Sequence, residues 1–189
     1  MKLDISIQGK AFSADLAVAY DISIPIRQGT DNPNAFFAPP VDISPMKSGD
    51  FVGSLEAGSP VNFKNLKINP HGNGTHTESC AHIFKDGKPI GETASTSLLI
   101  AYLHSVLPER KPNGDKVIQA SALDDLSLSQ ADAFILRTLP NNPEKKLRQY
   151  SGTNPAYCEA ELLYELKMRG IDHFLLDLPS RSEEHTSEL

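Results

Sequence analysis

The sequence predicts one mixed α/β domain over residues 1–180, and three features support this fold class. Two stretches within the first 26 residues, 3–7 and 20–26, alternate apolar and polar side chains, as expected for a hairpin or meander. Near the C-terminus a strand, a helix and a strand follow one another, an order that favours parallel pairing. The length fits a single domain, and no internal repeat or second domain is visible.

The individual elements follow from local patterns. Leu3, Ile5 and Ile7 alternate with polar residues, residues 11–19 look extended, and Tyr20 to Ile26 alternate again. Further strands are expected at 61–68, 97–107, 133–139 and 172–178, with short helical turns over 120–130.

The C-terminal helix has a clear expected start. Asn154 is a suitable N-cap, Pro155 fits the first helical position, and Gly170 lies past the expected end. Cys158 would then lie inside the helix, as a core residue.

Residues 27–60 are rich in Pro, Gly, Asn and Asp, which predicts a long loop. A structureless segment of this length inside a domain is usually functional. Three interpretations stay open: a lid over a pocket, a clasp on a partner subunit, or a surface loop whose Phe36, Phe37 and Phe51 pack downward.

Composition excludes several classes of protein. The net charge is −6 and no Lys/Arg run occurs, which argues against nucleic-acid or anionic-membrane partners. The N-terminus lacks a signal-peptide pattern, and the longest apolar run, residues 98–103, is far shorter than the roughly 20 residues of a membrane span. Cys80 and Cys158 make no disulfide framework. We therefore expect a soluble, cytoplasmic protein.

The last nine residues, RSEEHTSEL (181–189), resemble the conceptual translation of a sequencing-adapter oligonucleotide. We expect this segment to be a non-native tail and exclude it from fold reasoning. The authentic protein is then expected to continue beyond Ser180.

The segment NPHGNGTHTESCAHI, residues 69–83, contains three of the six histidines of the chain. Imidazole and carboxylate groups are ligands for zinc and other divalent transition metals, so His71, His76, Glu78 and His82 are candidate ligands. Gly72 and Gly74 allow the tight turn that would fold these groups around one point. A solvated polar loop and a metal-free acid/base site remain the alternatives.

A divalent metal at such a site lowers the pKa of bound water and polarises a carbonyl, which suits hydrolysis of an amide, ester or lactam. No nucleophile-elbow, P-loop or dinucleotide-binding motif competes with this interpretation. Three roles are open for Cys80: a metal ligand, a nucleophile, or a small residue that only fills space in the fold. The third role is favoured. His104 is expected to be a structural histidine of its strand rather than a ligand.

HGNGTHTESCAH resembles the H-x-G-T-H-x-D-x-P-x-H signature of the cyclase-like metal-dependent hydrolases, which include bacterial kynurenine formamidase and isatin hydrolase. One residue is inserted between His71 and His76, Glu78 stands in place of Asp, and Cys80 in place of Pro. The stretches YDISIPI (20–26, with Ile24 in place of a His), YSGTNPAY (150–157) and LLDLPS (175–180) are similar to further family segments.

The resemblance implies a swivelling β/β/α fold, with a mixed sheet or barrel and flanking helices. It implies that His71, His76 and Glu78 bind one or two zinc or manganese ions and that His82 is catalytic, moving a proton. It also implies a small-molecule amide, formamide or lactam substrate and a homo-oligomer. The alternatives are an ester or lactone hydrolase or a cyclase on the same site, or a metal- or ligand-binding protein without turnover. The family uses a further His and Glu after the D-L-P-S strand, and no credible copies occur here.

Overall fold

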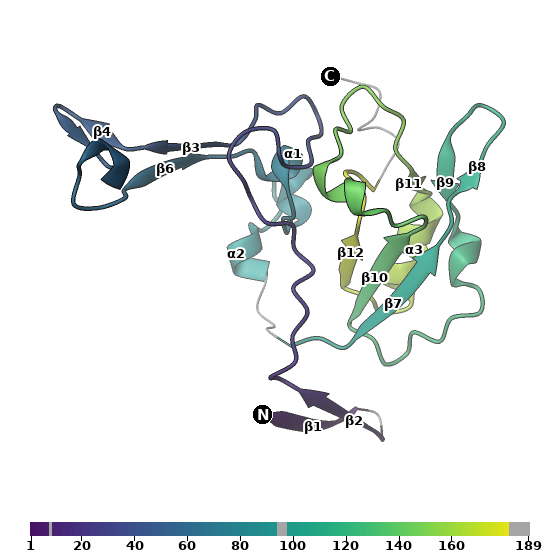
Figure 1. Ribbon diagram of the computed structural model, residues 1–189. Coiled ribbons are helices and arrows are strands. Elements are labelled where there is room, and N and C mark those ends of the chain that lie inside the picture. Colours follow the sequence, from purple (N-terminus) through teal and green to yellow (C-terminus); the bar gives the residue numbers. More distant parts are fainter. Residues whose placement is uncertain (8, 94–97, 182–189) are drawn as a thin grey trace.

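The computed structural model describes residues 1–7, 9–93 and 98–181 (Figure 1). Its secondary structure is mixed, with several small sheets and few helices, so the predicted α/β class is confirmed. The prediction allowed either a mixed sheet or a barrel. The described residues form open sheets and no closed barrel, so the sheet applies. No helix in this part of the chain is long and apolar enough to cross a membrane.

A three-stranded parallel sheet organises the body of the molecule. Its order is β12 (His173–Leu176), β10 (Ala133–Thr138) and β7 (Ala101–Val106). These strands confirm the expected parallel pairing and three of the predicted strands. Ser97, at the start of one of those predictions, lies outside the described residues.

The core lies on one face of this sheet. The register places Tyr102, Phe134 and Phe174 in one row across the three strands, and neighbouring rings stack with centroids 6.1 and 6.4 Å apart. Helix α3 (Ala160–Met168) buries Leu162 and Leu166 against the same core, because positions four apart share a helix face.

A second small sheet and a 3₁₀ turn complete this core. The sheet has the order β11 (Tyr157–Cys158), β9 (Lys116–Ile118) and β8 (Glu109–Arg110), and η3 (Ala120–Leu123) follows β9. The turn confirms the predicted helical character of residues 120–130.

The predicted start of the C-terminal helix is wrong. The helix begins at Ala160 rather than Pro155, because Tyr157 and Cys158 pair with β9 and thereby hold the backbone extended. Cys158 is therefore a strand residue, although it is buried as expected. Gly170 does follow the helix, in a left-handed conformation.

The long loop predicted over residues 27–60 is only partly a loop, because residues 42–67 form an arm of paired strands. Strand β3 (Asp42–Pro45) pairs antiparallel with β6 (Lys64–Lys67), and β4 (Lys47–Ser48) pairs with β5 (Phe51–Val52) at the far end, next to η1 (Leu55–Ala57). Figure 1 shows this ribbon projecting from the body. Strand β6 confirms the strand predicted over 61–68.

The N-terminal hairpin is shorter than predicted. It consists of β1 (Lys2–Ile7) and β2 (Lys10–Asp15) only. The prediction of a strand over residues 20–26 is wrong, because this stretch pairs with no strand in the described part of the chain. Tyr20 and Ile22 are 87% and 68% exposed, so they are not the half-buried residues that the alternation predicted.

Four remaining elements are short. They are α1 (Pro70–Asn73), η2 (Cys80–His82), α2 (Ile90–Thr93) and η4 (Pro143–Leu147).

Candidate metal centre

A capped helical turn, α1, fixes the position of His71. Asn69 is the N-cap, and its side chain accepts a hydrogen bond from the amide of Gly72 at 3.2 Å. Asn73 is fully buried; its side chain accepts from the Asn69 amide at 2.9 Å and donates to the carbonyl of Pro39 at 3.1 Å. The turn is therefore tied both to itself and to the segment that precedes β3.

Gly72 allows this turn to lie directly against that segment. A Cβ at this position would lie 2.3 Å from the Cβ of Ala38 and 2.9 Å from the carbonyl oxygen of Ala35. The Ala35 amide in turn donates to the Gly72 carbonyl at 2.9 Å. Only glycine fits this approach, and the residue beside it is His71.

A second capped turn, η2, presents His82. Ser79 precedes η2, and its hydroxyl accepts from the Ala81 amide at 3.3 Å and donates to the Lys88 carbonyl at 2.6 Å. Gly87 packs against this turn, since a Cβ there would lie 2.5 Å from the backbone of Ala81. Glu78 lies immediately before the turn, four residues from His82.

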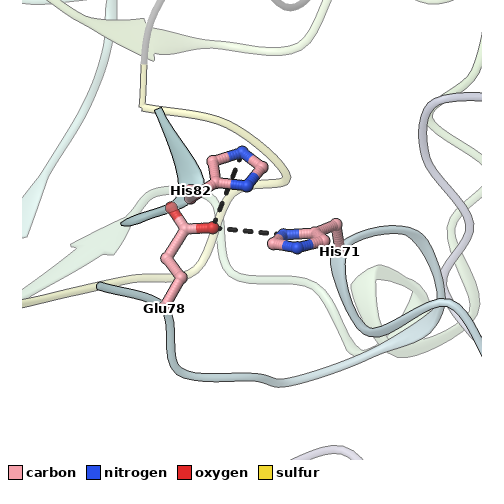
Figure 2. A group of neighbouring side chains, drawn as sticks. All are labelled: His71, Glu78 and His82. Carbon is pink, nitrogen blue, oxygen red and sulfur yellow. Dashed lines mark ion pairs between the residues drawn. The ribbon is translucent and has the colours of Figure 1, made fainter. Parts of the chain in front are cut away.

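The four predicted residues converge on one carboxylate oxygen. Oε2 of Glu78 lies 3.2 Å from Nδ1 of His71, 3.6 Å from Nε2 of His76 and 3.9 Å from Nε2 of His82. Figure 2 shows dashed lines from one carboxylate oxygen of Glu78 to the rings of His71 and His82. These two rings stack with centroids 4.2 Å apart, and His76 meets His71 edge-on at 4.9 Å.

These separations fit a metal centre. Four donors at bonds of about 2.0–2.2 Å in a tetrahedron are about 3.3–3.6 Å apart. One ligand atom each from His71, Glu78 and His82 lies within 4.8 Å of the others. Imidazole with carboxylate is a donor set that zinc and manganese accept. The residues present therefore fit the divalent metal that the sequence predicts.

His76 is oriented by its second ring nitrogen. Nδ1 lies 3.1 Å from the carbonyl oxygen of Gly74, a hydrogen-bond acceptor, and Nε2 on the other side of the ring faces Glu78 at 3.6 Å. Metal-binding histidines commonly have this arrangement, in which a backbone carbonyl selects the tautomer.

The centre is open to solvent on one side. The side chains of His71, Glu78, His82 and His76 are 42, 37, 33 and 25% exposed, respectively. Partial burial lowers the pKa of His71 below its usual range. The neighbouring imidazoles of His82 and His76 lower this pKa further, and Glu78 acts in the opposite direction. His71 is thus neutral near pH 7, the form that binds a metal.

Three other side chains singled out in the sequence lie outside this cluster. Cys80 is exposed, and it does not belong to the group of converging donors found in the described ranges. His104 lies in β7 with its ring 6.3 Å from that of Phe134, which agrees with a structural role. Burial raises the pKa of the Cys158 thiol to about 12, so it is an inert core group.

The sequence did not reveal what supports the site. Residues 34–39 contact the histidine loop and are themselves held by residues 148–151. The backbone amide of Asn34 donates to the Arg148 carbonyl at 3.1 Å, and the backbone carbonyl of Asn34 accepts from the Tyr150 amide at 2.7 Å. An ion pair between Lys145 and Asp177, 2.6 Å long, fixes η4, just before residues 148–151, to the sheet. The Asn69–Pro70 pair, a capping signal, was the one local pattern that could have indicated α1.

The family assignment agrees with this geometry. The family model entitled "Putative cyclase" matches residues 20–181, which include the arm, the histidine loop and the central sheet. No curated protein matches the chain. Members of this family are typically metal-dependent, consistent with the cluster of His71, Glu78 and His82. The chain belongs to the Cyclase family.

Proposed function

We propose that this protein is a metal-dependent hydrolase that cleaves a C–N bond in a small amide, formamide or lactam. The observation that carries the proposal is the convergence of three imidazoles on Oε2 of Glu78, at 3.2, 3.6 and 3.9 Å. Such a donor set is suited to zinc or manganese, with one or two ions per site. When bound, the ion supplies Lewis acidity and lowers the pKa of water.

The residues of the chain divide the remaining work. His71, His76 and Glu78 hold the metal, with His76 oriented by the Gly74 carbonyl. His82 is the proton carrier, because its Nε2 is the farthest of the three nitrogens from Glu78 Oε2 and a histidine not held by metal can accept and return a proton near neutral pH. The open side of the site admits the substrate.

A specific observation favours a second division of roles at the same site. The group of converging ligand atoms consists of His71, Glu78 and His82, without His76. In this arrangement His82 is a ligand, and His76, held by Gly74, is the proton carrier.

Single substitutions separate the two arrangements. Metal affinity and hydrolysis are measured for His76→Ala and His82→Ala, with His104→Ala as a matched histidine control outside the cluster. The ligand variant loses metal and rate together, whereas the proton-carrier variant keeps its metal and loses rate, typically about 10²–10⁴-fold. If both variants retain full activity, the site assignment is wrong.

The reaction is tested with a substrate panel of N-formyl aryl amides, lactams, esters and lactones. Amide or lactam turnover that depends on added metal supports the proposal. Turnover of esters or lactones alone indicates an esterase on the same site. Tight metal binding without turnover of any class refutes the hydrolase and indicates a metal-binding protein.

A further inference from the structure

Two consecutive phenylalanines, Phe36 and Phe37, have backbone conformations that their residue type disfavours. Their φ angles are 56° and 52°, and they are the non-glycine positions with positive φ in the ranges that the structure describes. The Ala38 amide donates to the Ala35 carbonyl at 3.1 Å, so the pair forms the centre of a tight turn, here called the Phe-Phe turn. Glycine and asparagine are usual where both central residues need positive φ, so this turn is strained.

Polar contacts hold the Phe-Phe turn. The Phe37 ring is 67% exposed, so packing of this ring does little to offset the strain. The Phe37 amide donates to the hydroxyl oxygen of Ser151 at 2.9 Å, and this hydroxyl donates to Oδ1 of Asn34 at 3.1 Å. The Asn34 side-chain amide donates in turn to the Ala38 carbonyl at 2.7 Å. Ser151 therefore fixes the strained peptide directly, and the end of the turn through Asn34.

The shape of the Phe-Phe turn determines where α1 lies. At the start of the turn, the Ala35 amide donates to the Gly72 carbonyl at 2.9 Å. Just past its end, the Pro39 carbonyl accepts from the buried side chain of Asn73 at 3.1 Å. Because α1 is hydrogen-bonded at both ends of the turn, a turn that relaxed to negative φ would displace α1. His71 is part of α1 and would move with it.

We propose that Ser151 is a positioning residue of the metal centre. Its hydroxyl keeps the Phe-Phe turn in the left-handed conformation, and the turn keeps His71 beside Glu78. This role rests on the proposed function, since it requires His71 to be a metal ligand, as it is in both divisions of roles. Ser151 acts through the backbone, and we assign it no contact with the substrate or the reacting atoms.

The first test follows the Ala35 amide by hydrogen exchange in the metal-free full chain. This amide is hydrogen-bonded to the Gly72 carbonyl, so its exchange rate reports how firmly α1 lies against the turn. Ser151→Ala removes the hydroxyl and should speed this exchange by about 2–10-fold, as expected for the loss of one hydrogen bond. Ser151→Thr keeps a hydroxyl and should exchange nearly as slowly as the wild type. Metal affinity, measured by chelator competition, should follow the same order.

A second substitution distinguishes relief of strain from a general change in stability. Added to Ser151→Ala, Phe37→Gly should restore both slow exchange of the Ala35 amide and metal affinity, because glycine adopts positive φ without steric cost. Phe37→Ala is the matched control: it also removes the ring but keeps the Cβ, so it should restore neither. A general loss of stability would not be reversed by glycine, which increases the conformational entropy of the unfolded chain.

The outcomes that overturn the inference differ from failure of the proposed function. If Ser151→Ala exchanges as the wild type does, or if glycine and alanine at position 37 act alike, the hydroxyl does not hold a strained turn. If exchange changes as expected but metal affinity does not follow it, the turn does not position His71. In both cases the wild type still binds metal, whereas a wild type that binds none refutes the metal centre itself and this positioning role with it.

Discussion

Gly72→Ala perturbs the metal centre without removing a ligand. The added methyl group would lie 2.3 Å from the Cβ of Ala38 and 2.9 Å from the Ala35 carbonyl oxygen. Both alanines are buried, and Ala35 is hydrogen-bonded to the Gly72 carbonyl, so neither can withdraw easily. The histidine loop must move instead, and His71 moves with it.

The expected cost follows from overpacking. Forcing a methyl group into a closed contact costs about 1–3 kcal/mol. The metal requires His71 and Glu78 close together, so the strain should appear largely in the bound state. A cost of about 1.4 kcal/mol corresponds to tenfold in affinity, so we expect metal to bind roughly 5–150-fold more weakly.

The assay is competition with a chromophoric chelator, accompanied by thermal unfolding of the apo protein. Gly91→Ala is the matched control, because a Cβ there meets nothing within 4 Å and the residue lies in α2. This control should bind metal as the wild type does. If Gly72→Ala also binds metal with wild-type affinity, the close packing of α1 does not position His71, and the reasoning fails.

Three further predictions follow from charge and burial. Lys145→Met leaves the partly buried Asp177 carboxylate without its cation, and should lower the free energy of unfolding by about 1–3 kcal/mol in a urea titration; an unchanged midpoint would contradict this. In the folded protein at pH 8, a thiol reagent should modify Cys80 but not Cys158, whose pKa burial raises to about 12; equal rates for both thiols would argue against the buried position. The lowered pKa of His71 means that the unfolded chain takes up a proton first as the pH falls below about 6.5, so the apo protein should lose stability on acidification through that region. His71→Gln should flatten this part of the pH profile, and a profile identical to that of the wild type would show that His71 is not responsible.

The central strands were predictable because their signal is local. Residues 133–139 and 172–178 contain the apolar runs AFIL and FLL, as expected for strands buried in a parallel sheet. The strand–helix–strand order then fixed their relative direction. The proximity of the four candidate residues was also predictable, because all of them lie within one short stretch of chain whose glycines allow a tight turn.

Features that depend on distant partners were not predictable. The Asn154–Pro155 pair is a sound helix signal, yet pairing of Tyr157 with β9 delays the helix to Ala160. The alternation at Tyr20–Ile26 indicates a strand, but a strand requires a partner, and the described chain supplies none. The contacts of residues 34–39 with Gly72 join segments more than thirty residues apart, for which one sequence gives no signal.

Metal binding tests the central claim most directly. Untagged protein, stripped with a chelator, is titrated with zinc and with manganese, and the Glu78→Gln variant is titrated in parallel. The three imidazoles meet at the carboxylate of Glu78, so the wild type should take up metal stoichiometrically. Glu78→Gln should lose more affinity than the roughly 10–100-fold that removal of an outer partner costs. A wild type that binds neither metal, or a variant that binds as tightly as the wild type, would contradict the account.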